Sequence, residues 1–111
     1  MQVKELNQSK IEKHPGCVAE ALSIIGNKWT ALLLMELSKG NTRFCHLEAS
    51  LKGISPRTLS QRLEYLTDKK IITKKNFQEM PPRVEYSLTK KGYDLTPVLQ
   101  SMAIWGNKYH Q

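Results

Sequence analysis

Cysteine is scarce in this sequence, which contains only Cys17 and Cys45. Two cysteines are too few for the disulfide framework that holds small secreted domains together. Long apolar runs are also absent, since the longest one, 31–35, is far too short to cross a bilayer. Residues 1–14 are polar and lack the apolar stretch of a secretory signal. We therefore expect a cytoplasmic protein with no membrane partner.

Motifs for catalysis and for metal binding are missing as well. The chain contains no glycine-rich nucleotide-binding sequence, no HExxH sequence and no GxSxG nucleophile turn. His14 and Cys17 are metal-ligand residue types, but their spacing is not that of a structural zinc site. The adjacent Cys45 and His46 do not have that spacing either. The sequence therefore predicts no enzyme activity, no metal and no cofactor.

Acidic residues are fewer than basic residues. Seventeen lysines and arginines face ten acidic residues, which gives a formal net charge of +7. Such a field favours polyanionic partners, namely DNA, RNA or an anionic membrane surface. The length of 111 residues and the hydrophobic content of 40% are sufficient for one domain with one core.

The apolar periodicity divides the chain into an arm and a folded domain. Residues 1–16 are polar and end in Pro-Gly, and we expect them to form an N-terminal arm. From residue 17 to residue 111 we expect a single domain. Apolar residues spaced by three and four predict a short helix over 18–25 and a mostly buried helix between Asn27 and Gly40.

The next segment has the organisation of a helix-turn-helix. Residues 44–52 and 55–69 predict two helices joined by a short turn that contains Gly53. Ser55 suits the N-cap of the second helix, and its leucines form one apolar stripe. The remaining surface carries hydrogen-bond donors that suit phosphates or base edges in the DNA major groove. The candidate contacts on this helix are Ser55, Arg57, Thr58, Gln61 and Arg62.

Past residue 70 the apolar period changes from that of a helix to that of a strand. Residues 71–77 and 83–88 predict a β-hairpin with prolines at its tip, and a hairpin after a helix-turn-helix is the winged form of the motif. Arg43 can either clamp the DNA backbone or brace this wing. The polar side chains that can reach phosphates or a minor groove from the hairpin are Lys74, Lys75, Asn76 and Arg83.

A final helix is expected after Thr89, and it carries more apolar surface than one small core requires. Surplus apolar surface usually marks an interface, and the first helix is expected to share it. The predicted interface residues are Val18, Leu22, Ile25, Val98, Met102, Trp105 and Tyr109. The predicted fold is thus α+β and mostly helical, a winged helix-turn-helix with terminal dimerisation helices. A two-fold dimer places its recognition helices about 34 Å apart, which predicts an inverted-repeat operator.

Many separated residues across 17–106 resemble the HxlR-type family of bacterial winged helix-turn-helix regulators. Among them are Gly26-Asn27-Lys28-Trp29, Gly53-Ile54-Ser55, Val84-Glu85-Tyr86 and Leu88-Thr89. The resemblance implies a homodimer that binds operator DNA near promoters, with its terminal helices in the dimer interface. It also implies a cysteine before the first core helix that senses oxidants or electrophiles. Cys17 matches that position, although Val18 follows it where the family often has proline.

These observations predict a sequence-specific transcriptional regulator whose partners are double-stranded DNA and a second copy of the chain. Cys17 is either a redox sensor or an inert small residue of the core. The alternative function is a winged-helix module that binds proteins, because a fold does not determine a function. A basic recognition helix beside a basic hairpin favours DNA.

Overall fold

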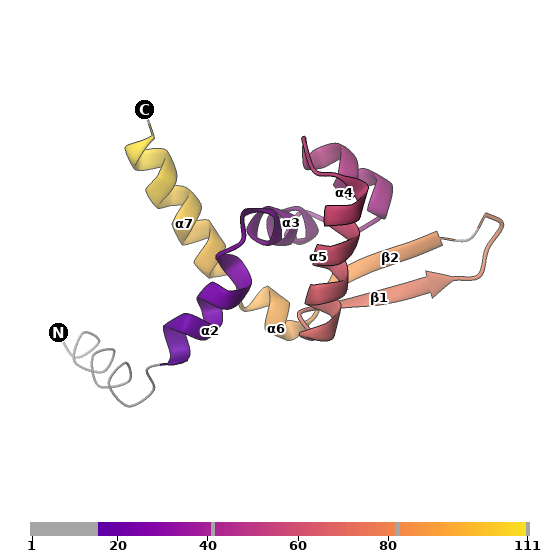
Figure 1. The fold of residues 1–111 in the computed structure, drawn as a ribbon, viewed down its shortest axis with the longest axis horizontal. Helices are drawn as coiled ribbons and strands as arrows, with labels where there is room; N and C mark the ends of the chain where they lie inside the picture. The colour runs from indigo at the N-terminus through magenta and orange to yellow at the C-terminus, as the bar shows by residue number, and fades with distance from the viewer. Residues whose placement is uncertain (1–15, 41, 82, 111) are drawn as a thin grey trace.

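The computed structural model describes residues 16–40, 42–81 and 83–110, so residues 1–15 of the expected N-terminal arm lie outside the described residues. Figure 1 shows the hairpin and α5 on one side of the body, with α2 and α7 extending from the other side. The predicted winged helix-turn-helix fold is confirmed. Its elements are α2 (Gly16–Ile25), α3 (Lys28–Ser38), α4 (Phe44–Ser50), α5 (Pro56–Asp68), β1 (Ile72–Phe77), β2 (Arg83–Leu88), α6 (Lys90–Tyr93) and α7 (Thr96–Tyr109).

Branched aliphatic side chains from several elements form one core. In α5, Leu59, Leu63 and Leu66 follow the helical period and are all buried, so they form a single stripe. The side chains on the opposite surface of α5 therefore point out of the protein body. The largest fully buried hydrophobic side chains are Leu33, Leu34, Leu47, Leu59, Leu63, Leu66, Ile71 and Ile72.

Side-chain caps at Asn27 and Ser55 define the starts of α3 and α5. Asn27 Oδ1 accepts hydrogen bonds from the backbone N–H groups of Trp29 at 2.9 Å and Thr30 at 3.2 Å. Ser55 Oγ accepts a 3.1 Å hydrogen bond from the Thr58 N–H at the start of α5. Each cap satisfies N–H groups that have no partner within the helix, which defines where the helix begins.

A sharp bend separates α2 from α3 at Gly26. A Cβ at this position would collide with the Leu22 carbonyl oxygen, which explains the glycine. Within the described ranges, no single helix is long and apolar enough to cross a membrane. Only α2 and α3 together reach that length and composition, as a pair bent by 81°.

The end of α5 is closed by a residue with left-handed backbone geometry. Lys70 has φ of 61°, its N–H donates to the Thr67 carbonyl at 3.0 Å, and the Ile71 N–H donates to the Leu66 carbonyl at 2.9 Å. This pair of bonds is the Schellman motif, in which glycine usually occupies the left-handed position. The motif turns the chain from α5 directly into β1.

The two strands are antiparallel and place opposed side chains on the same face of the hairpin. Ile72 faces Leu88, and Lys74 faces Tyr86 two residues further out on that face. The segment before α4 joins the outer side of β2, because the Tyr86 N–H donates to the Thr42 carbonyl at 2.8 Å. The wing is thereby attached to the helix-turn-helix just before α4 and just after α5.

The expectation of one continuous helix after Thr89 was wrong. Thr89 does cap a helix, since its Oγ1 accepts from the Gly92 N–H at 3.2 Å, but this helix, α6, is a single turn. Pro97 has no N–H to donate to the carbonyl four residues earlier, and its ring would clash with that carbonyl. Proline is tolerated in the first turn of a helix, so the chain breaks and α7 starts afresh at Thr96.

Candidate nucleic-acid interface

The outward surface of α5 carries two donor side chains that the protein itself leaves free. Arg57 and Gln61 lie opposite the buried leucine stripe, and both are exposed. Neither has a hydrogen bond or an ion pair with another residue in the described part of the chain. The first turn of α5 contains no acidic residue, so the positive end of the helix dipole is not neutralised there. This end of α5 is therefore suited to an anionic partner.

Ser55 and Thr58 have different capacities at this helix start. Ser55 Oγ accepts from the Thr58 N–H and donates to Thr58 Oγ1 at 3.0 Å, so its only proton is already donated within the cap. The Thr58 hydroxyl accepts this bond and keeps its own proton to donate. The structure thus assigns Ser55 mainly to helix formation and leaves Thr58 as a free donor.

One flank of α5 faces α2 rather than solvent. Tyr65, whose spacing placed it on the outward side with Arg57 and Gln61, is instead half-buried and donates a 3.0 Å hydrogen bond from its hydroxyl to the Ser23 carbonyl oxygen. The guanidinium of Arg62 lies 5.2 Å from the centre of the Tyr65 ring, a cation–π contact. Arg62 is consequently half-buried beside Tyr65, away from Arg57 and Gln61.

Three further polar residues on α5 were missed by the sequence analysis. Ser60, Glu64 and Asp68 are exposed and follow Arg57 at steps of three and four residues, so they share its side of the helix. Helical spacing alone would have identified them. With them included, the outward surface of α5 is basic at its N-terminal end and acidic at its C-terminal end.

Lys74 and Lys75 point to opposite faces of the wing because side chains alternate along a strand. Lys75 lies opposite Glu85, and its Nζ is 5.1 Å from the centre of the Phe77 ring. Lys74 and Asn76 share the other face, with Tyr86 and Val84 as their respective partners across the ladder. The predicted contacts Lys74, Lys75 and Asn76 are all exposed, but they cannot all serve one surface.

Arg83 and Arg43 are occupied by contacts within the protein. Arg83 Nη1 lies 3.3 Å from Glu79 Oε1, and its guanidinium stacks 4.3 Å from the centre of the Phe77 ring. Arg83 Nε is 3.1 Å from Glu85 Oε2, a charge contact that lacks hydrogen-bond alignment. Arg43 Nε lies 3.8 Å from the same oxygen, and its backbone bridges to Glu85. For Arg43, this geometry favours the role of bracing the wing over that of clamping the DNA backbone.

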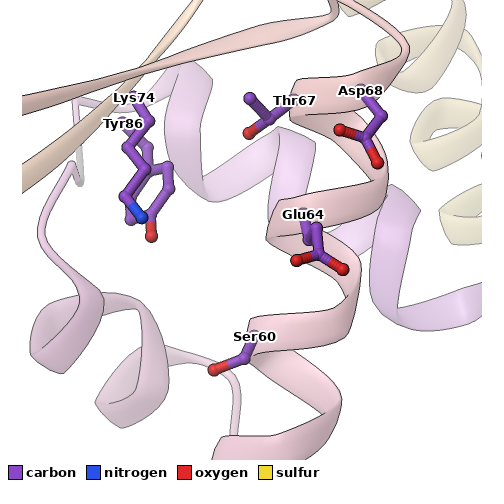
Figure 2. Close-up of a pocket in the computed structure, with 6 residues that line it drawn as sticks. All are labelled: Ser60, Glu64, Thr67, Asp68, Lys74 and Tyr86. Atoms are coloured by element: carbon purple, nitrogen blue, oxygen red, sulfur yellow. The ribbon is translucent and has the colours of Figure 1, made fainter.

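A hollow of about 310 Å³ lies between α5 and the hairpin. Figure 2 shows Lys74 and Tyr86 entering it from the hairpin, while the other lining residues come from α5. Burial raises the pKa of the Tyr86 hydroxyl above its ordinary value of 10.0, so this group is a neutral donor at physiological pH. The lining residues are Ser60, Glu64, Thr67, Asp68, Lys74 and Tyr86.

The apolar stripe on α7 lies outside the core of the subunit. Leu99 is buried and anchors the start of α7, whereas every residue from 100 to 110 is exposed, and Trp105 is 67% exposed. Figure 1 shows α7 extending away from the rest of the domain. Apart from Ile25, the predicted interface residues are exposed, namely Val18, Leu22, Val98, Met102, Trp105 and Tyr109.

Two residues change the predicted apolar surface. Ile25 is only 7% exposed and belongs to the core, so it has little surface to offer a partner. Ile104 is 69% exposed and was missed, because it lies off the stripe that passes through Met102 and Trp105. The exposed apolar surface of α7 is therefore wider than a single stripe.

Cys17 is exposed at the start of α2, which excludes the reading of it as a buried core residue. It lines a largely apolar hollow between α2 and the α6–α7 junction, together with Ala21, Ile24 and Leu95. Cys45 on α4 is also an exposed free thiol. Among the described residues, no group of three or more His, Cys, Asp or Glu side chains could hold a metal ion.

Known proteins match this chain over most of its length. The family model described as HxlR-like helix-turn-helix matches residues 24–111. The HTH-type transcriptional regulator YvaP of Bacillus subtilis is 37% identical over 90 residues, covering 81% of this chain and 83% of YvaP. The family match includes α5, the wing and α7.

Solved structures agree with the same assignment. The oxidised form of the redox regulator HypR aligns with 85% of this chain and 97% of its own, at 32% identity and a TM-score of 0.80. The reduced form of the transcriptional regulator YodB from Bacillus subtilis aligns with 84% of this chain and 91% of its own, at 31% identity and a TM-score of 0.73. The chain therefore belongs to the HxlR-like helix-turn-helix family of transcriptional regulators, which are not enzymes.

Proposed function

We propose that the protein acts as a homodimer that binds an inverted-repeat operator through the N-terminal half of α5. The observation that carries this proposal is the pair of unpartnered donors, Arg57 and Gln61, on the outward face of a helix whose other face is buried. An arginine fork suits the O6 and N7 atoms of guanine, and a glutamine amide suits the N6 and N7 atoms of adenine. Both bases present these atoms in the major groove.

The wing supplies contacts to the DNA backbone in this proposal. Lys75 and Asn76 are exposed on opposite faces near the end of β1, and Lys74 lies closer to α5. Phosphate contacts of this kind position a protein on DNA without reading its sequence. Arg83 and Arg43 contribute by holding the hairpin in place rather than by binding phosphates, because their guanidinium groups already face carboxylates.

The homodimer is supported by the exposed apolar surface of α7 and α2. Met102, Trp105 and Tyr109 form a stripe on a helix that projects from the body, and Val18 and Leu22 add exposed apolar surface on α2. A soluble monomer rarely leaves so much contiguous apolar surface in water. A two-fold axis through this surface sets two copies of α5 about one DNA turn apart, or about 34 Å.

We further propose that Cys17 makes DNA binding responsive to oxidants or electrophiles. The thiol is exposed and lies on α2, the same helix that receives the Tyr65 hydrogen bond from α5. One structural neighbour is described as a redox regulator, which supports this role. Modification of the thiol adds bulk beside the apolar hollow of Leu95 and Ala21 and shifts α2 relative to α5.

The decisive experiment is selection of bound genomic fragments followed by binding measurements on the selected site. We expect Arg57→Ala combined with Gln61→Ala to weaken specific binding by about 100-fold or more, since each bidentate contact discriminates by about 1–3 kcal/mol. Lys90→Ala, which removes one exposed positive charge on α6, is the matched control. A double variant with unchanged affinity and an intact dimer would refute base reading by this surface.

For the thiol response, DNA affinity is compared before and after treatment with a mild oxidant in the wild type and in Cys17→Ser. We expect the wild type to respond and the variant not to respond, while Cys45→Ser behaves as the wild type. An equal response in Cys17→Ser would exclude Cys17 as the sensor. The competing function, a module that binds only proteins, predicts no selected DNA fragment at all.

A further inference from the structure

We propose that the hollow between α5 and the wing seats one phosphodiester of the DNA backbone, with the Tyr86 hydroxyl as its most deeply placed donor. This inference rests on the proposed function, because it adds a binding site to the same DNA-facing surface. None of the candidate contacts derived from the sequence included Tyr86 or Ser60.

Tyr86 combines a buried ring with an unused hydroxyl. The side chain is only 8% exposed, and its ring packs in the core. The hydroxyl lines the hollow and has no hydrogen bond to another residue that the structure describes. The hydroxyl oxygen itself is open to the hollow, because it is not one of the fully buried polar atoms without a partner. An acceptor from outside the chain can therefore reach it, and a charged acceptor binds a hydroxyl more strongly than water does.

Two more donors face the same hollow. Lys74 lies directly opposite Tyr86 in the β-ladder, so its ammonium group and the hydroxyl share one face of the hairpin. Ser60 points into the hollow from α5 and is exposed. The Thr67 hydroxyl is not available, since it donates to the Leu63 carbonyl at 2.7 Å. An ammonium and two hydroxyls arranged around one space suit a tetrahedral anion with several oxygens.

The position of the hollow identifies the source of that anion. It lies between the helix proposed to enter the major groove and the hairpin proposed to approach the neighbouring groove. A strand of the DNA backbone separates two adjacent grooves, so it must pass between these two elements. A phosphodiester of that strand is therefore the anion that reaches Lys74 and Tyr86.

Glu64 and Asp68 oppose this binding in part. Both line the α5 side of the hollow, across from Lys74 and Tyr86. Their charge repels a phosphate, which places the phosphate nearer the hairpin. The same charge would attract a small cation, and this competing occupant makes the opposite prediction for Glu64.

The test measures the affinity of purified dimer for its selected operator and for an unrelated duplex at several salt concentrations. Tyr86→Phe removes only the hydroxyl, and we expect affinity for both duplexes to fall about tenfold, as a hydrogen bond to a charged group would imply. Lys74→Gln should lower the slope of log affinity against log salt by about one. Glu64→Gln should strengthen binding to both duplexes by a few fold.

Tyr93→Phe is the matched control, because Tyr93 is an exposed tyrosine on α6 that does not line the hollow. Folding of Tyr86→Phe is checked by thermal unfolding, where we expect no loss of Tm. Unchanged affinity of this folded variant would overturn the inference, and so would a loss confined to the operator, which would indicate base reading. Weaker DNA binding by Glu64→Gln would indicate that a cation, rather than a phosphate, occupies the hollow. That result would also overturn the inference. If the wild type binds no duplex, the proposed function itself fails and this inference with it.

Discussion

The Tyr65 hydroxyl donates a 3.0 Å hydrogen bond to the Ser23 carbonyl oxygen, and this bond joins α5 to α2. The two residues are 42 positions apart in the chain, so the contact is purely tertiary. It links the helix that carries Arg57 and Gln61 to the helix that carries Cys17 in its first turn. We expect a movement of α2 to act on α5 through this bond.

Replacement of Tyr65 by phenylalanine tests this link. We expect the free energy of unfolding to fall by about 0.5–1.5 kcal/mol, because one hydrogen bond is lost while the ring contact with Arg62 remains. Urea denaturation measures the change. We also expect the variant to keep its DNA affinity but lose most of its response to oxidants. A full response in Tyr65→Phe would show that α2 and α5 are coupled by another route.

Replacement of Arg57 by lysine separates base reading from charge. The substitution keeps the positive charge but removes the planar fork that makes two bonds to guanine. We expect specific binding to weaken by about 1–3 kcal/mol at one position of each half-site, with the salt dependence unchanged. Operator variants with each base at that position provide the measurement. A uniform loss on all sequences would instead identify Arg57 as a phosphate contact.

The stripe on α7 is tested by Trp105→Glu. A carboxylate at an exposed position costs a monomer little, but at the centre of an apolar interface it is left without a partner. We expect the dimer to dissociate while the helical circular dichroism signal is retained, as followed by sedimentation. Gln100→Glu adds the same charge on the other side of α7 and should leave the dimer intact. A Trp105→Glu protein that stays dimeric would move the interface elsewhere.

The cost of a positive φ can be measured by comparing two adjacent lysines at the end of α5. Lys70 has φ of 61°, whereas Lys69 has φ of −80°. Because glycine adopts positive φ without steric cost, we expect Lys70→Gly to raise the free energy of unfolding by about 1 kcal/mol. Lys69→Gly should lower it by about 0.5–1 kcal/mol, since glycine there gains freedom in the unfolded chain and loses the contact of the Lys69 ammonium group with the Tyr65 ring. Equal effects of both substitutions would contradict this account.

Burial of Tyr86 predicts a dependence of stability on alkaline pH. Its folded pKa is raised above the ordinary value of 10.0 by desolvation. Below about pH 10 the hydroxyl is protonated in both states and contributes no pH dependence. Above that pH the unfolded state releases the proton first, so stability falls as pH rises through the folded pKa. Above pH 10 the wild type should therefore become less stable relative to Tyr86→Phe, which has no hydroxyl to titrate; a stability difference that stays constant with pH would be inconsistent with the shift.

Local chemistry was enough to predict most of the elements and the exposed donors of α5. Asn27 and Ser55 cap helices through bonds to residues two or three positions ahead, so their role is visible in the sequence. The leucine stripe of α5 likewise follows from spacing alone, and it leaves Arg57 and Gln61 on the outer surface. The break before α7 was missed although its cause, Pro97, is also local.

Only the tertiary structure decided which charged groups are free. Arg83 and Lys74 look equivalent in the sequence, but Arg83 is held by Glu79 and Glu85 while Lys74 faces the hollow beside Tyr86. Which partner a long side chain meets depends on how strands and helices come together, and the period of one element does not contain that information. The sequence by itself determined the elements and their buried faces, because caps and periodicity act over a few residues. The hollow and the Tyr65 link depend on contacts between distant segments.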